Sequence, residues 1–164
     1  MSSRAKLGFT FLALVVILFV GAHARYPGRA SIKLPPTSCD ATLWQHTYDS
    51  ARLPVIEECT AAEGRITAVH FNSDGDVHLE LDPDDRHLLN LVNATHMHAK
   101  LIAEVVCEHQ PQDVPADKNA CIGFHSPVQL PKVGDRVRIT GAYVTDRDNG
   151  WNELHPVTRI EVLH

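Results

Sequence analysis

The sequence predicts an all-β domain: a small five-stranded barrel with an N-terminal arm or short helix, stabilised by disulfides. Three observations lead to this prediction. Several short segments alternate apolar and polar residues with a period of two, as half-buried strands do. Two of the connections carry Asp-Gly or Asn-Gly, the pairs that favour hairpin turns. Four cysteines, an even number, follow an N-terminal segment that is typical of exported proteins.

The first 24 residues predict a secretory signal peptide. Arg4 and Lys6 precede an apolar stretch at residues 7–22, and the small residues of Ala22-His23-Ala24 suit cleavage. An uncleaved membrane anchor is the alternative, but a spanning helix needs about 20 apolar residues, more than this stretch has. We therefore expect a secreted or cell-envelope protein. The chain then divides into a signal peptide (1–24), a flexible linker (25–38) and an OB-like β domain (39–164).

The strands are expected from residue 64 onward. Residues 40–58 predict an arm or short helix, because their apolar side chains follow no strand period. Gly141 predicts a bulge or sharp bend in the fourth strand, as a small closed barrel requires. Pro156 is expected to interrupt the fifth strand. The five strands are predicted at residues 64–71, 77–82, 101–107, 135–145 and 151–163. Five strands with a bent fourth one are typical of an OB-like barrel.

All four cysteines lie in the predicted exported part, where an oxidising compartment favours disulfides. Three pairings are possible. We prefer the sequential pairing, because each bond would then fix a poorly patterned segment to nearby chain. It joins Cys39 to Cys59 and Cys107 to Cys121. The spacings do not fit a structural zinc site, which usually has two cysteines only a few residues apart.

Charge and missing motifs exclude several classes of function. The net charge is −5, and removal of the signal peptide, which carries two basic residues and no acid, makes it about −7. An acidic surface repels phosphate backbones and disfavours nucleic-acid binding. The sequence lacks the nucleophile elbow GxSxG, the phosphate loop GxxxxGK[ST], the dinucleotide motif GxGxxG and the zinc motif HExxH.

A possible metal site lies on the polar faces of the second and fifth strands. His78 shares a face with Glu80 and Asp82 in one strand, as does Glu153 with His155 in the other. Histidine and carboxylate together ligate zinc or perform acid–base chemistry, so His78, Glu153 and His155 are the predicted ligands. If the first strand lies between the second and the fifth, His70 lies between these two faces. The competing interpretation is that both faces are simply solvent-exposed.

One resemblance rests on motifs spread over residues 43–160. The motifs are Tyr48…Arg52-Leu53…Cys59, Asp74-Gly75-Asp76-x-His78, Glu104-x-x-Cys107, Gly134-Asp135…Gly141-x-Tyr143-Val144-x-Asp146 and Gly150-Trp151-x-Glu153-Leu154-His155-Pro156-Val157. In these the chain resembles a group of exported bacterial and archaeal proteins with an OB-like domain. The resemblance implies the fold and export, and it implies no activity.

These observations leave three hypotheses for the function. The leading one is an exported binding or interaction module of the cell envelope or extracellular space, whose partner is a small ligand or a protein. Any contact with a membrane would be made only through an uncleaved N-terminal segment. The second is a metal-dependent hydrolase that uses His78, Glu153 and His155. The third is an OB-type domain that binds oligosaccharide or single-stranded nucleic acid, which the acidic charge disfavours.

Overall fold

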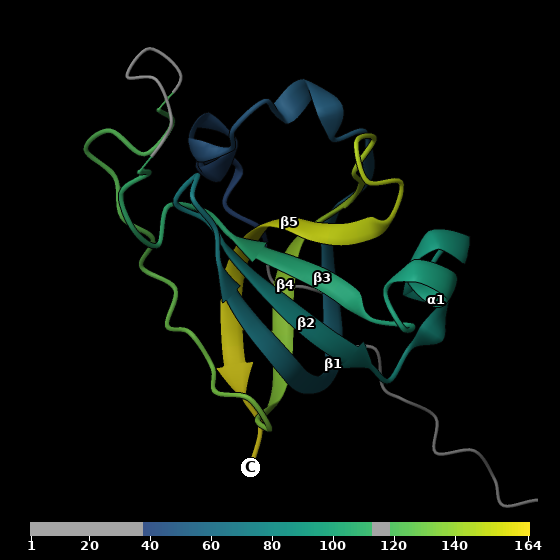
Figure 1. Cartoon of the computed structure of the whole chain (residues 1–164). Coiled ribbons are helices and arrows are strands. Elements are labelled where there is room, and N and C mark those ends of the chain that lie inside the picture. Colours follow the sequence, from purple (N-terminus) through teal and green to yellow (C-terminus); the bar gives the residue numbers. More distant parts are fainter. Residues whose placement is uncertain (1–37, 113–118) are drawn as a thin grey trace, which may run out of the picture. The chain divides into compact units, whose positions relative to one another are not determined.

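The computed structural model describes residues 38–112 and 119–164, which fold mostly into β-strands (Figure 1). The strands are β1 (Val55–Phe71), β2 (Val77–Pro83), β3 (Leu101–Val105), β4 (Arg136–Thr145) and β5 (Asn152–Val162). The helices are short: η1 (Ala41–His46), η2 (Ser50–Arg52), η3 (Arg86–Leu88) and α1 (Leu91–His96). The prediction of a mostly β domain with five strands is confirmed. The predicted signal peptide and residues 25–37 of the predicted linker lie outside the described residues.

The five strands form one sheet that closes on itself, in the order β1-β2-β3-β5-β4 and back to β1. Neighbouring strands are antiparallel, except that β3 and β5 run parallel. This order corrects one expectation. β5 lies between β3 and β4 and does not pair with β1. His70 of β1 therefore does not lie between the polar faces of the second and fifth strands.

The alternation in β2 gives the closed sheet its inner and outer faces. Val77, Leu79 and Leu81 are fully buried, while His78 and Glu80, which alternate with them, point outward. Burial of such side chains provides most of the favourable free energy of folding. The interior is apolar and includes Ile66, Leu79, Leu81, Leu101, Ile139 and Leu154.

β1 is longer than the predicted strand at residues 64–71. Residues 55–63 were not predicted as strand, because apolar and polar residues do not alternate in their sequence. β1 pairs with β4 from Val55 to Arg65 and with β2 from Gly64 to Phe71, so it changes partner near Gly64. The two backbones approach closely at this point: a Cβ on Gly64 would lie 2.2 Å from the carbonyl oxygen of Asp82. Only glycine fits such a contact.

The expected irregularity at Gly141 is confirmed. The register of β4 against β5 shifts on both sides of this residue. A Cβ there would lie 2.7 Å from the carbonyl oxygen of Pro156. The expected break in the fifth strand is wrong: β5 continues through Pro156, which a cis peptide bond joins to His155.

Two disulfides connect Cys39 with Cys59 and Cys107 with Cys121, and the predicted sequential pairing is confirmed. The first ties the arm, here defined as residues 40–53, to β1. The second closes the loop that follows β3. The arm is also held at its far end, where Arg147 N donates to the carbonyl oxygen of Arg52. In the part of the chain that the structure describes, no helix has the length and apolar character that crossing a membrane demands.

Candidate metal centre

Five ionisable side chains meet on the outer face of the closed sheet. We call them the polar cluster: Asp76, His78, Glu104, Glu153 and His155. Strand alternation places them on one face, because Val77 and Leu154, next to them in sequence, point into the core. The register then brings the strands together. His78 of β2 lies opposite Glu104 of β3, and Glu153 of β5 lies opposite Ile102 of β3.

Glu104 connects the two histidines. Its Oε1 atom lies against Nε2 of His78, and its Oε2 atom lies against Nδ1 of His155. Nδ1 of His155 is also 3.1 Å from Oε1 of Glu153. Glu153 in turn accepts a hydrogen bond of 2.8 Å from Nε1 of Trp151. A continuous chain of contacts therefore runs from β2 across β3 to the start of β5.

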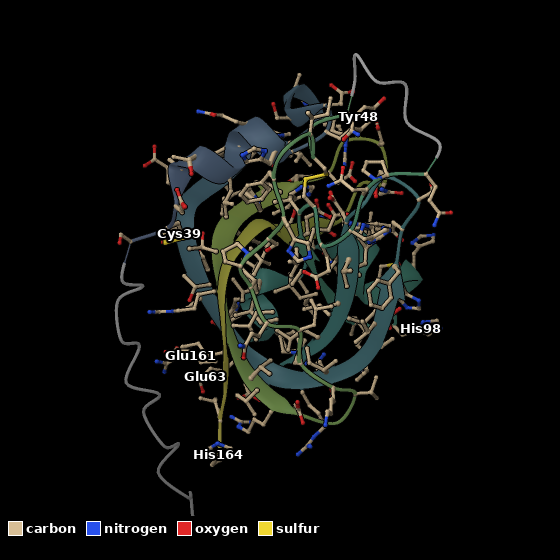
Figure 2. All side chains as sticks on the ribbon, turned by 90° about the vertical axis from the view of Figure 1, so that its left-hand side faces the viewer. Cys39, Tyr48, Glu63, His98, Glu161 and His164 are labelled. Carbon is tan, nitrogen blue, oxygen red and sulfur yellow. A yellow bond between two sulfur atoms is a disulfide. The ribbon has the colours of Figure 1, made fainter. Side chains whose placement is uncertain are left out.

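Four of the five side chains in the polar cluster are buried although they face outward. His155 and Glu153 are fully buried, Glu104 is 3% exposed and Asp76 is 4% exposed. The arm and the disulfide loop provide the cover. Leu43 of the arm packs with Cys107 and Cys121 of the loop. Figure 2 shows this end of the molecule, with a disulfide lower in the view and to the left of the label of Tyr48.

The loop also contacts the polar cluster directly. Cys107 N donates a hydrogen bond of 2.8 Å to Oδ1 of Asp76. Asp76, Glu104 and His155 each offer one possible ligand atom, and these three atoms lie within 4.8 Å of one another. Among the described residues, Nε2 of His155 is buried and has no hydrogen-bond partner. Such an atom is rare in native proteins and needs a physical explanation.

The members of the polar cluster shift one another's pKa values. Burial opposes ionisation of Glu104, but the charge and hydrogen bond of His155 and the contact with His78 outweigh it and lower its pKa. Burial also opposes a charge on His155, yet Glu104 and Glu153 raise its pKa. For His78, burial is again outweighed by Glu104, which raises the pKa. Burial raises the pKa of Asp76 to about 7, and the charge of His155 offsets this only in part.

Arg52 brings a positive charge toward the polar cluster from the arm, where it interacts with the charges of Glu104 and Glu153. It is already paired with Asp146, at 2.5 Å. One guanidinium therefore faces three buried carboxyl groups, those of Asp146, Glu104 and Glu153. Because unpaired buried charge is costly, the remaining negative charge requires protons on the histidines or a bound cation.

The structure brings the three predicted ligands, His78, Glu153 and His155, into one polar cluster. Glu104, which was not predicted as a ligand, lies between the two histidines. His155 contacts Glu153 directly, whereas His78 reaches His155 only through Glu104. The predicted neighbour His70 lies opposite His78 in the register of β1 and β2, but its side chain pairs with Glu80 at 3.2 Å. Asp82 pairs with Arg86 and Lys100 on the surface.

Two members of the polar cluster were not among the predicted ligands. The strand period contained a signal for Asp76, since Asp76-x-His78 repeats the spacing of Glu153-x-His155. For Glu104, the only signal in the sequence was a carboxylate within an otherwise apolar strand. Several residues of the motifs that carry the resemblance lie in the polar cluster or contact it: Arg52, Asp76, His78, Glu104, Trp151, Glu153 and His155.

The fold and site define a disulfide-bonded, five-stranded β domain with a buried histidine–carboxylate cluster on its outer face. Comparison with protein families, with curated proteins and with solved structures gives no match.

Proposed function

We propose that this protein is an exported binding module with an OB-type barrel that holds one divalent metal ion, zinc by the chemistry of its ligands, in the polar cluster. One observation carries the proposal. Asp76, Glu104 and His155 offer ligand atoms within 4.8 Å of one another, and the Nε2 atom of His155 is buried without a partner. A bound ion supplies that partner and also the positive charge that the buried carboxylates need.

The surroundings of His155 support this assignment. Histidines that ligate metal almost always turn their other ring nitrogen toward a carboxylate or a carbonyl, which fixes the ring. Here Glu153 faces Nδ1 at 3.1 Å and would orient the ring, so Glu104 would turn from Nδ1 to the ion that Nε2 binds. Glu153, which accepts from Trp151, then acts as a positioning residue, and His78 is the candidate fourth ligand.

The mixed imidazole and carboxylate ligands favour zinc over calcium, which takes oxygen ligands only. Burial favours binding over hydrolysis, because a catalytic zinc keeps one position open to substrate. Of the five side chains in the polar cluster, His78 is the most exposed, at 24%, and the other four are almost completely covered.

The strand order supports the OB type. A five-stranded Greek-key barrel needs the third strand to pair with the fifth and the fourth to close against the first, as β3, β5, β4 and β1 do here. Two disulfides are compatible with an oxidising compartment. Together with the predicted signal peptide, they support export.

The test is the metal content of protein that has been exported by a host cell and purified without a polyhistidine tag. After dialysis against zinc and then against metal-free buffer, we expect about one zinc per chain by mass spectrometry, the ratio of a single structural site. H155Q and E104Q should lose it. H87Q is the matched control, because His87 is an exposed histidine of η3.

Near-ultraviolet circular dichroism, which reports the packing of Trp44 and Trp151, separates lost ligands from lost folding. A folded wild type that retains no zinc, manganese or copper would show that protons neutralise the polar cluster, and the proposal would fail.

A further inference from the structure

The second disulfide lies beside the polar cluster and shares a residue with it. Sγ of Cys107, Sγ of Cys121 and a carboxylate oxygen of Asp76 lie within 4.8 Å of one another. Cys107 and Cys121 are buried, at 0% and 2% exposed. Asp76 is therefore the common member of two ligand sets. One set consists of oxygen and nitrogen atoms, and the other would contain two sulfur atoms once the disulfide is reduced.

We propose that the dithiol form of Cys107 and Cys121 binds a soft divalent metal ion together with Asp76, and that formation of the disulfide transfers the ion to Glu104 and His155. The transfer rests on the proposed function, whereas the thiolate site does not. Zinc binds thiolates strongly, and a disulfide offers no comparable ligand. Oxidation therefore removes two of the three ligands of the first set and leaves Asp76, which already belongs to the second.

The chemistry balances with a dithiol or a disulfide as the exchange partner. A dithiol reductant gives two electrons and two protons to the Cys107–Cys121 bond, which becomes two thiols, while the reductant becomes a disulfide. The metal ion then displaces the two thiol protons as it binds. In the reverse direction, a protein or small-molecule disulfide accepts the two electrons, the bond forms again and the sulfur ligands are lost.

The position of Asp76 explains why the two sets are linked. Its Oδ1 atom accepts the hydrogen bond of Cys107 N, so the carboxylate is fixed against the cysteine backbone. It follows the hairpin turn directly, where Gly75 has a φ of +101°. A Cβ on Gly75 would lie 3.3 Å from Sγ of Cys121, so the turn and the disulfide are in close contact. The turn thereby holds Asp76 between the sulfur atoms and the other members of the polar cluster.

Cobalt is the probe that distinguishes the two sets, because cobalt bound to thiolate absorbs in the near ultraviolet and cobalt bound to carboxylate and imidazole does not. The whole exported protein is titrated with Co²⁺ before and after treatment with a dithiol. We expect the thiolate absorption only after reduction, with zinc affinity increased by about tenfold or more. Oxidation should abolish the absorption while the ion stays bound.

Variants assign the sulfur atoms. A dithiol also opens Cys39–Cys59, so C39S/C59S is the control that must keep the absorption, and C107S/C121S must lose it. D76N should weaken binding in both redox forms, because Asp76 belongs to both sets. Near-ultraviolet circular dichroism of the reduced wild type shows whether the chain is still folded.

The outcomes separate this proposal from the preceding one. If the folded, reduced wild type shows no thiolate absorption, or if the reduced protein unfolds, the thiolate site does not exist. If the absorption appears but the oxidised protein holds no metal, the thiolate site stands, and both the transfer and the site in the polar cluster are wrong. If oxidised protein binds zinc and reduction changes nothing, only the site in the polar cluster stands.

Discussion

Glu104 of β3 and His155 of β5 lie against each other on neighbouring parallel strands, and both are buried. Each is needed to neutralise the other. Removing one partner of a buried pair leaves an uncompensated charge, which costs far more than the pair itself contributes. This relationship determines what substitutions in the polar cluster should do.

In the metal-free protein, E104Q should lower the free energy of unfolding by about 3–5 kcal/mol, the range for breaking a buried ion pair. The amide keeps the shape of the side chain but leaves His78 and His155 without their shared carboxylate. Urea denaturation measures the change. E80Q is the matched control: Glu80 lies on the same outer face of β2, and its partner His70 is exposed. Equal effects of the two substitutions would contradict a special role for Glu104.

W151F should weaken zinc binding by about tenfold, the lower end of the effect of residues that position a ligand. Phenylalanine preserves most of the ring but removes the N–H that donates to Glu153 at 2.8 Å. The number of zinc ions bound should stay the same, because no ligand is lost. Competition with a chromophoric chelator gives the affinity. W44F, in the arm, controls for the loss of an indole; a larger loss there would refute the positioning role of Trp151.

Asp146 should stabilise the fold above about pH 4 and lose this effect in acid. Burial opposes its ionisation, but hydrogen bonds from Asn149 and Asp148 and the charge of Arg52 lower its pKa below the ordinary 3.8. A lowered carboxyl pKa gives stability that is complete above the ordinary value and disappears as the pH falls through the lower one.

The measurement compares melting temperatures of wild type and D146N between pH 2 and pH 7. At neutral pH the variant should be less stable by about 1–3 kcal/mol, as expected for a hydrogen bond to a charged group. The two curves should converge in acid. A difference that is independent of pH would mean that packing, and not the charge of Asp146, stabilises this turn.

G141A should destabilise the domain by about 1–3 kcal/mol, as overpacking usually does. The added Cβ would meet two backbone atoms, the Pro156 carbonyl oxygen at 2.7 Å and Val157 Cα at 3.1 Å, which can move only with β5. Thermal unfolding measures the loss. V133A, at an exposed site, should change stability by less than about 0.5 kcal/mol. If G141A were as stable as wild type, β4 and β5 would not approach each other this closely.

Export should remove residues 1–24, because small residues at Ala22 and Ala24 follow a short apolar stretch. Intact-mass measurement of protein recovered outside the cytoplasm of a host should give the mass of residues 25–164. A22L, which places a bulky residue at the cleavage site, should block processing. Recovery of the full-length mass from wild type would indicate a membrane anchor instead.

The sequence determined the local structure where a simple period or a special residue was present. Alternation in β2 and β4, the turn at Gly75 and the irregularity at Gly141 were all predictable, because each depends on neighbours along the chain. The start of β1 was not. The sequence of residues 55–63 shows no apolar–polar alternation, since residues 55–58 are exposed and the buried positions that follow are Thr60 and Ala62. This half of the strand is held by pairing with β4.

The polar cluster also has a part that the sequence predicted and a part that it did not. The period of two placed His78 on one outward face, and Glu153 with His155 on another, from sequence alone. It could not show that β3 lies between those strands, so Glu104 was not among the predicted ligands. Nor could it show that the arm and the disulfide loop cover this face.

The sequence by itself thus determined the strands and which side chains share a face, and it favoured the disulfide pairing that the structure shows. The tertiary structure alone decided that an outward, polar face is buried. The physical reason is that burial and charge pairing depend on which distant segments meet. Those contacts are set by the packing of the whole chain, and no local pattern of residues records them.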